Sequence, residues 1–203
     1  MIFTAMLALS GCSAAVAPAA APTPTVVPAA PTPTVAPAAP APTSALAAAW
    51  VPAPRTKTTG CVSQGGLPDP ACTPGATDPR VSVATIDATI CTSGYTATVR
   101  PAVSVTDRIK REQMAAYGLQ GELLSGYELD HLISLELGGA PADVANLWPE
   151  SWTGDTNAHQ KDAVETHLKR EVCTGAMSLS DAQRMIATDW LAVYRAKALQ
   201  PAP

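Results

Sequence analysis

Apolar residues recur at helical spacing in three segments of the later part of the chain. Residues 104–119, 157–173 and 181–197 each carry apolar side chains every three or four positions, which gathers them on one face of a helix. The last segment opens on Ser180-Asp-Ala-Gln183, an order that matches a capping box at a helix start. The pattern therefore predicts three helices, each with an apolar face available for packing.

Strand patterns and loop signals occupy the rest of this part of the chain. Residues 95–101 (YTATVRP) alternate as a strand does, and residues 127–139 (YELDHLISLELGG) form an aliphatic run closed by two glycines. A short extended piece is expected at residues 146–148, stopped by the proline that follows. Residues 59–80 are rich in Gly and Pro and predict a loop, whereas residues 81–90 fit a strand or a short helix. Strands and helices together predict an α+β domain.

Residues 13–58 differ in composition from the rest of the chain. They are mostly Ala, Pro, Thr and Val, contain eleven of the twenty prolines and no acidic residue, and repeat Pro-Thr-Pro-Thr-Val at residues 22–26 and 31–35. Proline removes backbone donors and alanine offers little surface to bury, so such a segment cannot form a core. We expect a disordered Ala/Pro-rich linker, extended like polyproline, and a folded domain over residues 59–203.

The first twelve residues indicate an exported protein. Residues 1–9 are apolar and lead into Leu9-Ser-Gly-Cys12, which resembles the lipobox of bacterial lipoproteins. This resemblance implies that Cys12 is acylated and holds the protein on the bacterial membrane, facing the periplasm or the exterior. The apolar stretch lacks the preceding Lys or Arg of a signal peptide and is too short to span a bilayer. A cysteine that follows an apolar run by chance is the alternative.

The predicted domain contains four further cysteines, Cys61, Cys72, Cys91 and Cys173. An even number in an exported chain favours disulfides, and four cysteines allow three pairings. We favour Cys61–Cys72, which closes a Gly/Pro-rich loop, together with Cys91–Cys173, which joins the first strand region to a late helix. A zinc site with four cysteine ligands is the alternative, but the closely spaced pairs typical of such sites are missing from the sequence.

The predicted domain is acidic. Residues 59–203 hold all seventeen acidic side chains and eleven of the thirteen basic ones, which gives a formal charge of −6. This balance argues against tight nonspecific binding of nucleic acid. A local basic patch formed by Arg100, Arg108, Lys110 and Arg111 would counter it, and a solvated helix face is the alternative interpretation of these four residues.

Asp130 and His131 stand side by side in an aliphatic segment, where two polar groups are costly to bury. A structural polar pair is one explanation. The residues that follow suggest a functional one, because a double glycine at positions 138–139, Asn146 in an extended piece and His159 in the next predicted helix come in this order.

This order of motifs resembles the HNH endonucleases, a family built on a ββα-metal finger, and the resemblance covers residues 127–165. The fold we expect is therefore a ββα-metal finger with additional helices. The resemblance implies that His131 is the general base, whose neutral imidazole takes a proton from the attacking water. Asp130 and His159 would be the metal ligands, for Mg²⁺ or Mn²⁺ in preference to Zn²⁺. Asn146 would either brace the loop by hydrogen bonds or reach the metal.

Two departures from the family pattern bear on this site. Ser134 stands where family members often have proline, and residues 148–156 lengthen the path from Asn146 to His159. Asp162 lies about one helical turn beyond His159 and is therefore the substitute ligand if the histidine lies at the surface.

The resemblance implies a metal-dependent endonuclease that hydrolyses phosphodiester bonds outside the cytoplasm, with DNA favoured over RNA. The alternative is a catalytically inactive binding or structural module of the cell envelope that keeps the finger fold. No protein partner is predicted. On the same helix as His159, Lys161 and Glu165 have the spacing of an i, i+4 ion pair, which is the simplest role for these two residues.

Overall fold

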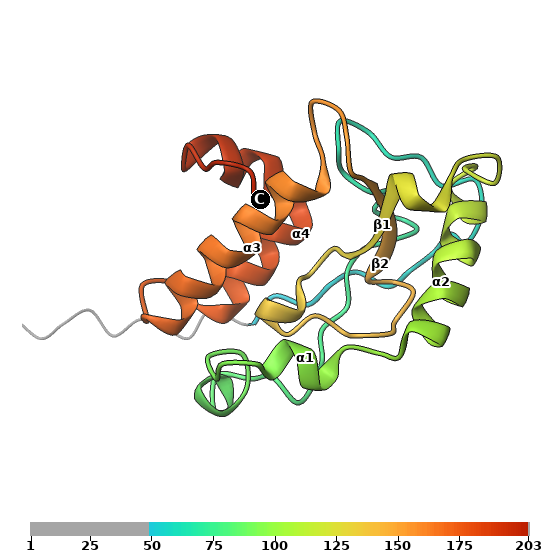
Figure 1. Ribbon diagram of the computed structural model, residues 1–203. Helices are drawn as coiled ribbons and strands as arrows, with labels where there is room; N and C mark the ends of the chain where they lie inside the picture. Colours follow the sequence, from blue (N-terminus) through green and yellow to red (C-terminus); the bar gives the residue numbers. More distant parts are fainter. Residues whose placement is uncertain (1–48, 203) are drawn as a thin grey trace, which may run out of the picture. The chain divides into compact units, whose positions relative to one another are not determined.

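The computed structural model describes residues 49–202, whose arrangement is shown in Figure 1. The predicted signal segment, the lipidation site Cys12 and residues 13–48 of the predicted linker lie outside the described residues. The described part is a mixed α+β structure, as the sequence predicts, with four α-helices and one two-stranded antiparallel sheet. In chain order the elements are α1 (Tyr95–Val99), α2 (Val103–Ala116), β1 (Tyr127–His131), β2 (Leu147–Ser151), α3 (Ala158–Cys173) and α4 (Leu179–Ala196).

The register of the sheet brings four polar or aromatic side chains onto one face. β1 and β2 pair so that Glu128 lies opposite Glu150 and Asp130 lies opposite Trp148. Residues opposite each other in an antiparallel pair share a face of the sheet. Pro149 lies inside β2 and does not stop this strand, contrary to the prediction. Each strand of a two-stranded sheet has an unpaired edge, where a residue without an N–H is tolerated.

The strand predicted at residues 95–101 is wrong, because this segment begins with the short helix α1. Gly94 adopts a left-handed conformation immediately before the helix, with a φ of 80°. At the other end, Pro101 disfavours a helical conformation for Arg100, which is extended and ends α1. The alternation of small residues in this segment is therefore a weaker signal than the glycine and proline around it.

The strand predicted over residues 127–139 ends early, at His131, and the chain then turns through the 3₁₀ turn η3 (Leu135–Leu137). Ser134 starts this turn by accepting a hydrogen bond from the backbone N–H of Glu136. The double glycine closes it for two different reasons. Gly138 is left-handed, with a φ of 73°, and a Cβ on Gly139 would collide with the backbone carbonyl of Ile133.

The three longer helices agree with the predicted ranges to within a few residues. The N-terminus of α3 has a capping box in which the Asn157 and Gln160 side chains each accept a hydrogen bond from the other's backbone N–H. At the start of α4 the N-cap is Ser178 and the predicted Ser180 lies inside the helix. The hydroxyl of Ser180 instead accepts a hydrogen bond from the backbone N–H of Trp50, at 2.6 Å.

The two residues that follow His131 belong to different apolar clusters. Leu132 belongs to a small cluster around the Cys61–Cys72 disulfide and Trp148, whereas Ile133 belongs to the main core. The main core lies where α3, α4 and η3 pack together. Its most buried members include Leu137, Val164, Leu168, Ile186 and Trp190.

Both favoured disulfides are present, Cys61–Cys72 and Cys91–Cys173. The second connects the segment before α1 to the last residue of α3, across 82 positions of the sequence. Two disulfides indicate an oxidising, extracytoplasmic environment. Within residues 49–202, no helix has the length and apolar character needed to cross a membrane.

The end of the predicted linker contacts the domain. Trp50 packs against the main core, and the Lys57 ammonium lies 2.9 Å from the Asp69 carboxylate. Backbone N–H groups of Thr56 and Lys57 also donate to the carbonyl of Ala71. The folded part of the chain therefore begins before residue 59.

Candidate functional site

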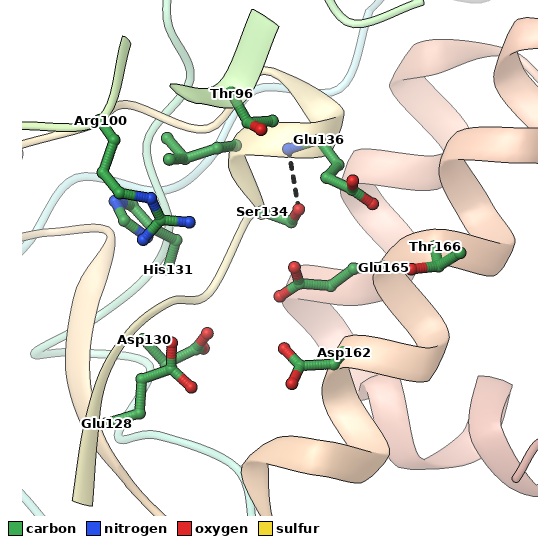
Figure 2. A pocket seen from close by; sticks show the side chains of 11 residues that line it. Thr96, Arg100, Glu128, Asp130, His131, Ser134, Glu136, Asp162, Glu165 and Thr166 are labelled. Atoms are coloured by element: carbon green, nitrogen blue, oxygen red, sulfur yellow. Dashed lines mark hydrogen bonds between the residues drawn. The ribbon is translucent and has the colours of Figure 1, made fainter. Parts of the chain in front are cut away.

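A pocket of about 230 Å³ lies beside the end of β1, between α1, η3 and α3 (Figure 2). Among the predicted site residues, Asp130, His131 and Asp162 line this pocket, whereas Asn146 and His159 do not. The tertiary structure thus brings the Asp-His pair of the strand next to a carboxylate of α3. The other polar side chains of the lining are Thr96, Arg100, Glu128, Ser134, Glu136, Glu165 and Thr166.

The two carboxylate oxygens of Asp130 have different surroundings, although the residue as a whole is buried. Oδ2 accepts a hydrogen bond from the indole Nε1 of Trp148 at 3.0 Å and lies 2.8 Å from Nζ of Lys161. Oδ1 makes no hydrogen bond to any residue in the described part of the chain. One oxygen is therefore held in place, and the other is available to a ligand in the pocket.

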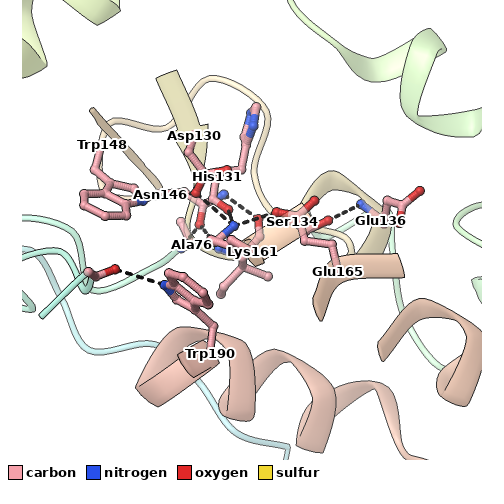
Figure 3. Close-up of polar contacts among 12 residues, drawn as sticks. Ala76, Asp130, His131, Ser134, Glu136, Asn146, Trp148, Lys161, Glu165 and Trp190 are labelled. Carbon is pink, nitrogen blue, oxygen red and sulfur yellow. Dashed lines mark hydrogen bonds and ion pairs between the residues drawn. The ribbon is translucent and has the colours of Figure 1, made fainter. Parts of the chain in front are cut away.

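Lys161 is a buried cation that joins α3 to β1 (Figure 3). Besides its ion pair with Asp130, Nζ lies 2.6 Å from Oε1 of Glu165 and donates a hydrogen bond to the backbone carbonyl of His131 at 2.8 Å. Burial alone would lower the pKa of Lys161, but the carboxylates, Asp130 first, outweigh it and raise this pKa above its usual value. The ion pair between Lys161 and Glu165 confirms the prediction from their spacing.

His131 has one ring nitrogen in use and one free. Nε2 lies 3.0 Å from the backbone carbonyl of Pro141, and a carbonyl oxygen can only accept, so Nε2 carries the proton. Nδ1 has no hydrogen-bond partner in the part of the chain that the structure describes. Burial lowers the pKa of His131 below its ordinary 6.5, which keeps the imidazole neutral at neutral pH. Nδ1 is therefore an acceptor for a proton.

Asn146 braces the loop between the two strands. Its Oδ1 accepts hydrogen bonds from the backbone N–H groups of Ile133 and Ala76, and its Nδ2 donates to the carbonyls of Ile133 and Ala140. The residue is fully buried and lies outside the pocket lining. Of the two roles implied by the resemblance, these hydrogen bonds correspond to the bracing role.

The two candidate ligands on α3 lie in different places. His159 is in the first turn of the helix, where its ring packs against Trp152 with 5.2 Å between ring centroids, outside the pocket lining. Asp162 lines the pocket together with Asp130. Burial raises the pKa of Asp162, and the neighbouring Asp130 carboxylate adds to this effect. Asp162, the predicted substitute ligand, therefore lies next to Asp130 (Figure 2), and His159 does not.

Several pocket carboxylates were not among the predicted site residues. Glu128 lies two residues before Asp130, on the same face of β1, and Glu165 lies one helical turn beyond Asp162. Burial raises the pKa of Glu128 to about 8 and that of Glu165 to about 7, the latter against the opposing effect of Lys161. The sequence could have indicated both residues, because Glu128 shares a strand face with Asp130 and Glu165 shares a helix face with Asp162.

Glu150 is a buried acid with no hydrogen bond in the structure. It is 2% exposed, lies opposite Glu128 in the sheet, and neither carboxyl oxygen has a partner within residues 49–202. Burial raises the pKa of Glu150 well above its usual value, and the negative charge of Asp130 raises it further. Burial thus favours the protonated form of Glu150 beside the ion pair of Asp130 and Lys161.

The donor set of the pocket suits a hard divalent cation such as Mg²⁺ or Mn²⁺, which takes carboxylate oxygens. In residues 49–202, no three His, Cys, Asp or Glu side chains are arranged so that they could together hold a metal ion. Mg²⁺ is commonly bound by one or two carboxylates, with water and substrate phosphate completing its shell. Asp130 from β1 and Asp162 from α3 fit that mode of binding.

Comparisons of the chain with protein-family models, with curated proteins and with solved structures found no match.

Proposed function

We propose that this protein is a metal-dependent endonuclease of the HNH type that hydrolyses phosphodiester bonds, with DNA favoured over RNA. The observation that carries the proposal is the pocket itself, where the neutral imidazole of His131 lies beside the carboxylates of Asp130 and Asp162. General base, hard oxygen ligands and an opening to solvent are the parts that metal-assisted hydrolysis needs.

The order of elements supports a ββα-metal finger in the proposed enzyme. β1, β2 and α3 follow one another, and the two sides of the pocket come from the first strand and from the helix. The loop between the strands is held by Asn146, which hydrogen bonds to the backbone of Ile133 and is not among the residues that line the pocket. Ser134, where the family often has proline, instead starts the turn η3.

In the proposed reaction, a water molecule attacks the phosphorus atom of the phosphodiester. Nδ1 of His131 takes one proton from this water as the new P–O bond forms, while the hydrogen bond from Nε2 to Pro141 keeps the ring in place. The bond from phosphorus to the 3′-oxygen breaks, and this oxygen takes a proton from solvent. The products are a 5′-phosphate and a 3′-hydroxyl.

Asp130 and Asp162 would hold the divalent cation, which when bound neutralises charge on the phosphate and on the leaving oxygen. Lys161 and Trp148 hold Oδ2 of Asp130, so Oδ1 is the oxygen available to the cation. Divalent charge would also favour the ionised form of Asp162, whose pKa is raised by burial.

A binding or structural module of the cell envelope is the second candidate function. The observation that favours it is that the ammonium of Lys161 already neutralises Asp130 inside the protein. The two candidates share an extracytoplasmic location, which the disulfides support. Attachment to the membrane through acylated Cys12 stays a prediction from the sequence.

The test is cleavage of plasmid DNA and of single-stranded RNA by the full chain, with disulfides intact, in Mg²⁺, Mn²⁺ or Zn²⁺ and in EDTA. His131→Ala should reduce metal-dependent cleavage by about 10²–10⁴-fold, the usual contribution of a general base. His167→Ala is the matched control, because His167 lies on α3 outside the pocket lining. Thermal unfolding would verify that both variants fold. A folded wild-type protein that cuts neither substrate with any metal would favour the second candidate function.

A further inference from the structure

Arg100 is the one cationic side chain in the pocket lining, and it is exposed. Figure 2 shows its guanidinium beside His131, across the pocket from Asp162 and Glu165. The side chain forms no ion pair and no hydrogen bond with any residue of the described part. It remains unpaired although five acidic side chains line the same pocket, namely Glu128, Asp130, Glu136, Asp162 and Glu165.

Other cations near the pocket are already paired. Lys161 is buried, and its three donors bind Asp130, Glu165 and the carbonyl of His131. Lys169 forms an ion pair with Glu136, at 3.2 Å. An anion that enters the pocket therefore finds its positive partner in Arg100.

The backbone around Arg100 is held from two sides. Arg100 ends α1, where its N–H donates to the carbonyl of Thr96, and the following proline keeps its backbone extended. At the other end of this short segment, Cys91 is bonded to Cys173 at the end of α3. The residue is thus carried by a tethered segment outside the two strands and helix of the proposed finger.

We propose that Arg100 binds a nonbridging oxygen of the phosphate in this pocket. This inference rests on the proposed function, because it names the phosphate-binding residue of the proposed nuclease. A guanidinium presents two parallel N–H groups to a phosphate and stays charged at all relevant pH values. Arg100 offsets the repulsion between the pocket carboxylates and an anionic substrate, and it binds the extra negative charge that the phosphate oxygens gain during attack by water.

The experiment compares four full-length proteins, namely wild type, Arg100→Gln, Arg100→Lys and Arg195→Gln. The substrate is bis(p-nitrophenyl) phosphate, a small phosphodiester that fits a pocket and needs no other DNA-binding surface. Arg195→Gln is the matched control: it removes the same charge from an exposed position of α4 that forms no ion pair within residues 49–202 and lies outside the pocket. Binding of the uncleaved analogue diphenyl phosphate, in the presence of Mg²⁺, is measured by calorimetry.

Arg100→Gln should lower kcat/KM by about 10²–10³-fold, the usual loss when one preorganised donor to a developing charge is removed. Arg100→Lys should recover part of this loss, and Arg195→Gln should match wild type. A purely structural role would not give rescue by lysine at unchanged thermal stability. Equal cleavage by Arg100→Gln and Arg195→Gln would overturn the role of Arg100 and leave the proposed reaction in place.

The binding measurement separates the two proposals. Binding of diphenyl phosphate that depends on Arg100, in a wild-type protein that cleaves nothing, would support the role of Arg100 and overturn the proposed reaction. A wild-type protein that neither binds nor cleaves a phosphodiester would overturn both.

Discussion

Two neighbouring regions share Asp130, and the cation of one is buried and paired whereas the cation of the other is exposed and unpaired within residues 49–202. One is the lysine cluster, which consists of Lys161 with Asp130, Glu165 and Glu150. Its cation is 1% exposed, and all donors of the ammonium are used. The other region is the pocket, where Arg100 is exposed and unpaired among the described residues and where Oδ1 of Asp130 is open.

Burial explains this difference. An isolated charge inside a protein costs several kcal/mol, so a lysine at the position of Lys161 must be paired and hydrogen bonded. Arg100 lines the pocket and is exposed to solvent, so its charge does not need a partner within the protein. We therefore expect loss of Lys161 to destabilise the fold, because it would leave buried carboxylates unpaired. The pocket side carries polar groups that have no partner within residues 49–202 and that the proposed function uses for binding. Substitutions on the two sides should separate stability from ligand binding.

Substitution of Lys161 should have the largest effect on stability. Lys161→Met keeps the length of the side chain but leaves Asp130 and Glu165 buried without their cation. We expect the free energy of unfolding to fall by about 3–5 kcal/mol, as measured by urea denaturation at neutral pH. Lys169→Met is the control, because its ion pair with Glu136 is partly exposed, and it should cost less than about 1 kcal/mol. Equal losses in the two variants would contradict a special role for the buried lysine.

Glu150→Gln should have a smaller effect that depends on pH. The pKa of Glu150 is raised in the folded state, so the carboxyl is protonated in both states below its ordinary pKa of 4.5 and does not make stability depend on pH there. As pH rises above 4.5, the unfolded carboxyl loses its proton first, and wild type is destabilised by up to about 1.4 kcal/mol per pH unit until the folded group titrates. The glutamine side chain does not titrate, so the variant does not lose stability in this way. Its stability relative to wild type should therefore rise as the pH increases above 4.5.

The measurement for Glu150 is thermal unfolding of both proteins across this pH range, in EDTA. Gln introduces an amide with a constant, pH-independent cost, so the change with pH is the quantity to compare. A constant difference in stability between the two proteins at all pH values above 4.5 would show that folding does not raise the pKa of Glu150.

On the pocket side, Asp162→Asn should leave stability within about 0.5 kcal/mol of wild type. It should nevertheless weaken Mn²⁺ binding by at least about tenfold, because a carboxylate ligand becomes a neutral amide. His159→Ala should bind Mn²⁺ like wild type, since His159 lies against Trp152 and outside the pocket. Calorimetric titration with Mn²⁺ tests both variants. Loss of binding in His159→Ala alone would restore the first ligand suggested by the family resemblance.

Much of the local structure could be predicted from the sequence. The three longer helices follow from apolar periodicity. The even number of cysteines favours disulfides, and the structure has the favoured pairing out of the three possible ones. The short segments were less predictable. Residues 95–99 alternate like a strand but form a helix, because five residues carry too little pattern to outweigh the flanking Gly94 and Pro101.

The candidate site was predictable only in its first strand. Asp130 and His131 stand out in the sequence because they interrupt an aliphatic run. The partner from α3 could not be selected, because His159 and Asp162 are both on the helix and only its packing against β1 decides which of them lies next to Asp130. Glu150 gives no sequence signal either, since its environment comes from strand register and burial.

By itself, the sequence determined the three longer helices, the double-glycine turn and the adjacent Asp-His pair of β1, and it favoured disulfides without fixing which cysteines pair. These features depend on local backbone preferences, on periodicity and on covalent chemistry, all of which are properties of short stretches of chain. Tertiary structure alone decided that Lys161 neutralises one oxygen of Asp130, that Asp162 lines the pocket, and that Arg100 lies across from it. The physical reason is that charge pairing and burial depend on which distant residues pack together, and a linear pattern of residues does not contain that information.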